Sequence, residues 1–154
     1  MAKKFNSVMP ENEINIIESI CKKGKTPKDC VTIKKFIVET INDGNLMIGF
    51  DLSDFMTLFH NDGTISVWEA STDALDENRM EKLLDQLIQQ CEVTSFHEMT
   101  LCIRCPKVNE LTMSEMCLLG DWFDKFDEGI QILWGFTHEE LQDNPQLHAM
   151  ALVQ

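Results

Sequence analysis

The sequence lacks the features that would place it in several large classes of protein. No apolar run approaches the roughly 20 residues that a membrane-spanning helix needs, and the start of the chain, MAKKFNSVMPENE, contains no apolar signal core. No segment is of low complexity, and the six cysteines are scattered, as expected for thiols in a reducing compartment. These absences predict a single cytoplasmic domain spanning residues 1–154, a length typical of one hydrophobic core.

Clustered glycines are also absent. The seven glycines are nowhere adjacent, and the chain contains neither a Walker motif nor a G-x-G-x-x-G. Phosphate-binding loops need closely spaced glycines, because backbone N–H groups must approach the phosphates without side chains in the way. The sequence therefore argues against direct nucleotide binding, and no cofactor and no metal site are predicted.

Positive charge is scarce and unevenly placed. The chain has 13 Lys and Arg against 26 Asp and Glu, a formal net charge of −13. Eight of the basic residues, all Lys, lie within residues 1–35, whereas the rest of the chain is strongly acidic. An acidic body repels phosphate backbones, so we expect no nucleic-acid partner. The lysine-rich segment is predicted to lie on the acidic body or in solvent.

Three helices are expected in the first part of the chain. Residues 11–23 place Ile14, Ile17 and Cys21 on one face. A second helix, over 27–43, begins after a Thr26 cap with Pro27 at its first position. A third is expected over residues 51–60. The second helix carries an apolar stripe at helical spacing, which comprises Cys30, Val31, Ile33, Ile37, Val38 and Ile41.

The second half predicts strands alternating with helices. Strands are expected at 64–70, 98–105, 130–136 and 147–153, with helices over 76–91 and 112–128. The later helix opens with the capping box Thr112-Met113-Ser114-Glu115 and is expected to turn Met116, Gly120 and Phe123 inward. The resulting order β-α-β-α-β-β predicts an α/β two-layer sandwich with a four-stranded sheet. The leading helices would cover an edge or the far face.

Few residue patterns indicate chemistry. Cys102 and Cys105 form a C-x-x-C, but on a strand they point to opposite faces and are poor joint ligands. A Cys–His nucleophile pair stays open, although nothing singles one out. Asp51 and Asp54 form a D-x-x-D at a helix start. That spacing suits an acidic, capped first turn and would also suit a pair that orients water.

Several strings, in order, resemble the C-terminal domain of the tubulin/FtsZ family, to which the bacterial cell-division protein FtsZ belongs. The segment GNLMIGFDLSDF resembles the family's synergy loop, N-x-D-x-x-D, which follows its central helix. NELTMSEM is similar to its strand-to-helix passage L-T-x-x-E-V, ILWG to its strand I-I-W-G, and LQD to its L-G-D. The likeness covers residues 27–154 and leaves 1–26 as a helical extension.

The resemblance implies a mixed four-stranded, chorismate-mutase-like sandwich. It also implies a synergy-loop interaction site at Gly49, Asp51 and Asp54, with Gly49 replacing the family's Asn. In family filaments these aspartates act on nucleotide bound to the next subunit, so the chemistry requires two subunits. The family's glycine-rich nucleotide loop is missing, so GTP hydrolysis by this chain alone is not expected.

Three functions follow. The first is a non-catalytic interaction protein, not an enzyme, whose partner is a protein: FtsZ or a second copy. The second is a small-molecule-binding domain or enzyme on the same sandwich, with His97, Arg104 or His138 converging in a mostly apolar pocket. The third is a fold kept only for homo-oligomerisation.

Overall fold

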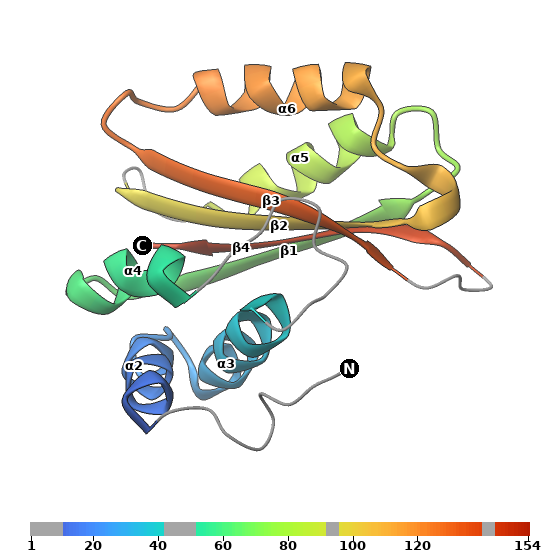
Figure 1. Cartoon of the computed structure of the whole chain (residues 1–154). Helices are drawn as coiled ribbons and strands as arrows, with labels where there is room; N and C mark the ends of the chain where they lie inside the picture. Colours follow the sequence, from blue (N-terminus) through green and yellow to red (C-terminus); the bar gives the residue numbers. More distant parts are fainter. Residues whose placement is uncertain (1–10, 42–51, 92–95, 140–143) are drawn as a thin grey trace.

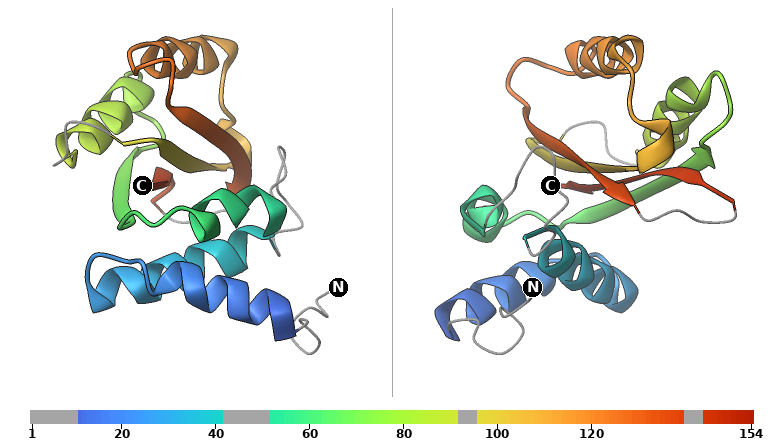
Figure 2. Two further views of the ribbon diagram at one scale, coloured as in Figure 1. Left: turned by 90° about the vertical axis from the view of Figure 1, so that its left-hand side faces the viewer. Right: turned by 45° about the vertical axis from the view of Figure 1, so that its right-hand side comes forward.

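The computed structural model describes residues 11–41, 52–91, 96–139 and 144–154. Helices lie on both faces of one open sheet (Figure 1). Two turned views show the same layering, with α5 and α6 on one side and the N-terminal helices on the other (Figure 2). The predicted order of three helices followed by β-α-β-α-β-β is confirmed, and the leading helices cover the far face.

The sheet has the mixed four-stranded topology that the resemblance implies. Its strands are β1 (Ser66–Asp73), β2 (Glu98–Pro106), β3 (Gln131–Glu139) and β4 (Gln146–Val153), in the spatial order β1-β4-β2-β3. β4 runs antiparallel to both β1 and β2, whereas β2 and β3 are parallel. The parallel pair needs a crossover, which the helix between β2 and β3 supplies.

The larger core lies between the sheet and the helices α5 (Arg79–Gln89) and α6 (Met113–Asp124). Met80, Leu83, Leu84 and Leu87 form the buried stripe of α5, at the spacing that the sequence predicts. α6 begins with the predicted capping box, in which the Thr112 side chain and the Glu115 side chain each bind the other residue's backbone N–H.

A smaller core lies on the opposite face. It is built by α2 (Glu11–Cys21), α3 (Pro27–Ile41), the short 3₁₀ turn η1 (Leu52–Phe55) and α4 (Met56–His60). The predicted Thr26 cap is present, since its hydroxyl accepts from the Asp29 N–H at 3.1 Å. From the sheet, only β2 and β4 contribute fully buried side chains to this core, Cys102 and Leu152.

The predicted apolar stripes are wrong in part. Ile14 was expected on the inner face of α2 but is 43% exposed, and Ile88 of α5 is 39% exposed. Gly120 faces outward on α6, where a Cβ would have no heavy atom within 4 Å, and Leu119 and Trp122 are the buried residues. Val31 was expected in the α3 stripe but is 70% exposed, whereas Phe36 and Thr40 are buried. In each helix the apolar pattern fits more than one face, and the sheet contact decides between them.

Among the described residues, none of the helices combines the length and apolar character required to cross a bilayer.

Candidate functional site

A cleft of about 650 Å³ opens between α3 and the sheet. One face of α3 forms its roof through Thr32, Lys35, Phe36 and Glu39, which are spaced at i, i+3, i+4 and i+7. The floor comes from the middle of three strands. The cleft therefore lies beside the smaller core, on the face opposite α5 and α6.

The floor of the cleft is a cross-strand row of polar side chains. His148 on β4 lies opposite Ser71 on β1 and opposite Arg104 on β2, so one row spans three strands. The next row brings Glu69, Met150 and Cys102 together in the same way. Register partners on one face have Cβ atoms about 4.5–5.5 Å apart, so each row forms a continuous surface.

The cleft mixes both signs of charge with an apolar base. Lys35 and Arg104 supply positive charge, while Glu39 and Glu69 supply negative charge. Phe36 and Cys102 are buried beneath them, and Arg104 and His148 are half-buried. Such a lining suits a small molecule that carries both a cationic and an anionic group on a compact apolar frame. Within the described segments, no group of three or more His, Cys, Asp and Glu could hold a metal ion.

The three polar residues expected to converge do not meet. Arg104 lines the cleft, near the end of β2. His97 precedes the start of that strand, and its N–H donates to the Gln154 carbonyl at 2.8 Å. His138 shares a face of β3 with Phe136, and its Nε2 lies 3.1 Å from the Glu110 carboxylate. His97 lies at the opposite end of β2 from Arg104, and His138 is the register partner of Cys105, so the sheet does not bring the three side chains together.

Sequence analysis missed His148 and Lys35. His148 interrupts the apolar strand LHAMALV, and Arg104 interrupts EMTLCIRC in the same manner. A polar side chain at an inward position of a buried strand indicates a polar site on that face. The pairing of the strands could not be deduced from either segment alone.

Asp54 lies half-buried on η1 and is not among the described residues that line the cleft. Gly49 and Asp51 lie outside the described residues. The interaction site that the family resemblance implies is therefore still a prediction.

Two buried thiols are poor nucleophiles. Burial, followed by the charge of Glu18, raises the pKa of Cys21 to about 11. Burial likewise raises the pKa of Cys105, whose Sγ lies 3.7 Å from the Thr137 carbonyl. Because the thiolate is the reactive form, neither group reacts readily near neutral pH. Cys102 and Cys105 belong to different cores, as the strand alternation predicts.

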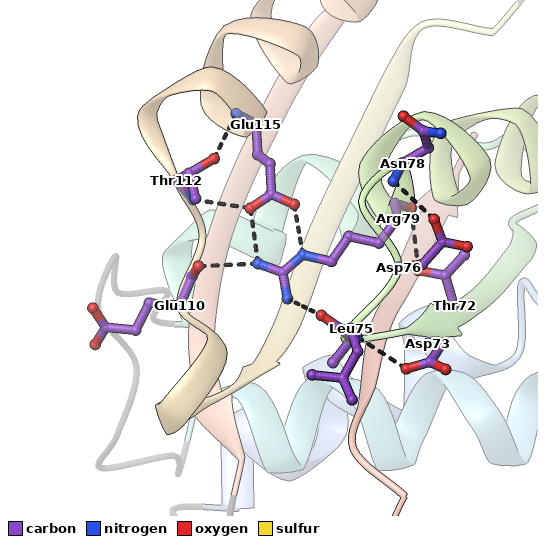
Figure 3. A network of polar contacts seen from close by, with 10 residues as sticks. Thr72, Asp73, Leu75, Asp76, Asn78, Arg79, Glu110, Thr112 and Glu115 are labelled. Atoms are coloured by element: carbon purple, nitrogen blue, oxygen red, sulfur yellow. Dashed lines mark hydrogen bonds and ion pairs between the residues drawn. The ribbon is translucent and has the colours of Figure 1, made fainter.

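A second polar cluster, centred on Arg79, is structural (Figure 3). The guanidinium donates to the Glu115 carboxylate from Nε at 2.6 Å and from Nη2 at 2.8 Å, and to the carbonyls of Ala74 and Glu110. Burial works to raise the pKa of Glu115, but the bonds from Arg79 and Thr112 outweigh it and lower that pKa. The cluster joins the ends of β1, α5 and α6.

Comparisons with known proteins show which solved structures have a similar architecture. No family model and no curated protein matches the sequence. An FtsZ variant from M. jannaschii has a similar structure, with a TM-score of 0.63, 18% identity and 82% coverage of this chain. The fold is that of the FtsZ C-terminal domain. TubZ protofilaments of Bacillus thuringiensis serovar israelensis give a TM-score of 0.55 at 8% identity over 81% of this chain.

The likeness extends to a third group, represented by CetZ1 from Haloferax volcanii, with a TM-score of 0.50, 17% identity and 84% coverage. The chain spans only 39% of the M. jannaschii protein, 35% of TubZ and 40% of CetZ1. At these identities the comparisons establish the fold.

Proposed function

We propose that this chain is an assembly module that acts by binding further FtsZ-like subunits, either a second copy or a nucleotide-carrying relative. The observation that carries the proposal is the fold itself. The same architecture occurs in an FtsZ dimer from M. jannaschii, with a TM-score of 0.58 and 14% identity over 84% of this chain, and in the TubZ protofilaments. In this proposal the chain acts through protein contacts.

The sequence supports a role without independent GTP hydrolysis. None of its seven glycines lies in a phosphate-cradling run. In the proposal, Gly49, Asp51 and Asp54 form the contact surface that faces the nucleotide of a neighbouring subunit. The chain would then alter filament assembly by occupying that neighbour.

Co-sedimentation with an FtsZ that assembles in GTP tests the proposal. We expect the chain to pellet with the polymer and to change both polymer mass and GTP turnover. Asp51→Ala combined with Asp54→Ala should abolish both effects, whereas Asp62→Ala, an exposed acidic residue in the turn after α4, should not. No pelleting and no change in turnover for the wild-type chain would refute co-assembly with FtsZ.

A second function, binding of a small zwitterionic molecule, is favoured by the cleft. Lys35 and Glu39 line the cleft from α3, and Arg104 and Glu69 line it from the sheet, over an apolar base, so one ligand could satisfy both signs. Nuclear magnetic resonance titration with a panel of amino acids and dipeptides tests this, with acetate and methylamine as single-charge controls.

We expect saturable shifts for the zwitterions, centred on α3, β1 and β4. Lys35→Ala should remove these shifts, because Lys35 lines the cleft. Lys34→Ala is the matched control, because Lys34 lies next to Lys35 on α3 but pairs with Glu18 at 2.6 Å. Equal shifts in the two variants would rule out the cleft as the binding site.

A further inference from the structure

The two edges of the sheet are finished differently. At one edge, β1 is sealed by α5, because the side-chain amides of Gln86 and Gln90 bond to its backbone at 2.6–3.2 Å. At the other edge, β3 pairs with β2 alone, and no other described strand lies beside it. An unpaired edge is a template for a further strand unless it is blocked.

The free backbone groups in the middle of β3 belong to three residues. The N–H of Gln131 donates to the carbonyl of His97, which precedes β2, at 2.9 Å. Successive residues of a strand turn their N–H and C=O groups to opposite sides, so those of Ile132, Trp134 and Phe136 point away from β2. We call these three residues the outer edge of β3. Among the described strands, none bonds to it.

The outer edge of β3 lacks the devices that usually block an edge strand. No Lys, Arg, Asp, Glu or Pro occurs from residue 130 to residue 137. The three side chains are half-buried at the margin of the larger core. Trp134 stacks on Phe136 with ring centroids 6.1 Å apart, and the Phe123 ring of α6 lies 6.2 Å from Trp134. The margin therefore presents aromatic surface together with free hydrogen-bonding groups.

This margin is complementary to itself. In an antiparallel pair of copies centred on Trp134, Ile132 lies opposite Phe136 of the second copy, and the outward N–H and C=O groups of the two copies meet. On the other face of the sheet, Leu133 is 36% exposed and lies opposite Gly135 of the second copy, where no side chain competes for the space.

We propose that two copies of this chain pair through the outer edge of β3, antiparallel and with Trp134 on a twofold axis, so that two four-stranded sheets form one continuous sheet. Because both copies use the same surface, the contact is isologous and closes at a dimer. It involves neither Asp54 nor the residues that line the cleft, so it goes beyond the proposed function.

Charge opposes this pair at long range but is absent from its centre. Each copy carries a net charge of −13, so the bonds and apolar contacts of the strand must outweigh repulsion. The charged residues around β3 gather at its two ends. They comprise Asp121, Asp124, Lys125, Asp127 and Glu128 on and after the last turn of α6, and Lys107, Glu110, His138 and Glu139 at the end of the strand.

The area of the margin suits a reversible dimer. Its length is about 25 Å at about 3.3 Å per residue, and its height across the strand and the flank of α6 is about 20 Å, so roughly 500 Å² of each copy is covered. A total of roughly 1,000 Å² is near the lower limit for a specific interface. We therefore expect a dissociation constant in the micromolar range.

Sedimentation velocity of the full chain over a concentration series tests the pair. Wild type should form a dimer and nothing longer. Leu133→Glu should raise the dissociation constant about tenfold or more, because the two new carboxylates lie diagonally across the contact, about 7–8 Å apart. Ile88→Glu is the matched control, since Ile88 is 39% exposed on α5, and it should leave the constant unchanged. Added salt should strengthen the wild-type dimer by screening the repulsion between copies.

Hydrogen exchange of the wild-type chain locates the contact without a substitution. The amides of Ile132, Trp134 and Phe136 should exchange fast in dilute solution and slow down in step with the fraction of dimer. The amides of Leu133 and Gly135 face β2 and should exchange slowly at every concentration. Circular dichroism checks that both variants fold; if Leu133→Glu does not, this exchange pattern decides.

Several results would overturn the β3 pair. They are a wild-type chain that stays monomeric up to about 1 mM, stacks longer than a dimer, or equal effects of Leu133→Glu and Ile88→Glu. Outer-edge amides that stay unprotected in the dimer, or that are already protected in the monomer, would also overturn it. Protection that arises only on adding an extended peptide of another protein would assign the edge to that protein instead. Pelleting with FtsZ is scored separately, so failure of the dimer leaves the proposed function standing.

Discussion

The two faces of the sheet are built differently. The face under α5 and α6 buries a continuous apolar core and is closed at its end by the Arg79–Glu115 pair. The face under α3 buries a smaller core and leaves the cleft beside it. One sheet thus has a side that stabilises the fold and a side on which polar groups remain within reach of a ligand.

The comparison also explains what sequence analysis can and cannot predict. The predicted stripe of α5 is confirmed at Met80, Leu83, Leu84 and Leu87, but Ile88, which was expected in the same stripe, is 39% exposed. The α6 stripe was wrong at Gly120, since Leu119 and Trp122 offer a competing face that only the sheet contact selects. Periodicity locates elements, but contact with other elements fixes their orientation.

The cleft was predictable only in part. Arg104 was identified as a candidate, but its neighbours in space come from β1, β4 and α3, which are far apart in the sequence. His148 meets Arg104 only because β4 inserts between β1 and β2. No local pattern predicts that strand order, and the family resemblance implied only a mixed four-stranded sheet.

The largest effect should come from matched cavities in the two cores. Leu83→Ala on α5 should lower the free energy of unfolding by about 3–5 kcal/mol, because Leu83 is fully buried in the larger core. Leu58→Ala on the short α4 should cost about 2–3 kcal/mol, since this smaller core can relax around the cavity. Urea denaturation measures the free energy of unfolding of both variants. Equal losses in the two variants would show that the smaller core does not relax around a cavity more readily than the larger one.

Breaking the ion pair should cost slightly less. Arg79→Met leaves the Glu115 carboxylate buried without its partner and should cost about 3 kcal/mol. The Glu115 side chain is 13% exposed, so solvent screens it only weakly.

The pair also makes stability depend on pH. The pKa of Glu115 is lowered in the folded state from an ordinary value of 4.5, so its contribution is complete above about pH 5 and is lost as pH falls through the lowered pKa. Glu115→Gln should therefore be less stable than wild type at pH 7, and the difference should shrink in acid. Thermal unfolding between pH 3 and pH 7 measures this; a constant difference would contradict the assignment.

The outer edge of β1 provides a third test. Gln86 and Gln90 each bind a backbone N–H and a carbonyl of that edge, at Ser71 and Glu69, with distances of 2.6–3.2 Å. Gln86→Ala with Gln90→Ala should cost about 1–2 kcal/mol and expose an edge strand to pairing. Light scattering should then show aggregation that Gln89→Ala, on the exposed side of the same helix, does not cause.

Two glycines give the smallest effects, with opposite signs. Gly120→Ala should stabilise the chain by about 0.5–1 kcal/mol, because the position is helical, exposed and open. Gly24→Ala should destabilise it, since a Cβ there would lie 2.9 Å from the Cys30 backbone nitrogen. Chemical denaturation of both variants measures the change in the free energy of unfolding. Destabilisation by Gly120→Ala would indicate that Gly120 lies on the inner face of α6 after all.

Hydrogen exchange of the native chain tests the contrast between the two faces most directly. Amides of α5, β2 and β4 should exchange only through global unfolding, and Leu83→Ala should accelerate them all together. Amides of α2 and α3 should exchange through a smaller opening of lower free energy. Leu83→Ala should leave the free energy of that opening unchanged, as long as global unfolding still requires more free energy than the opening does. Exchange of α3 at the same free energy as α5, with the same response to Leu83→Ala, would show one uniform unit and contradict the account.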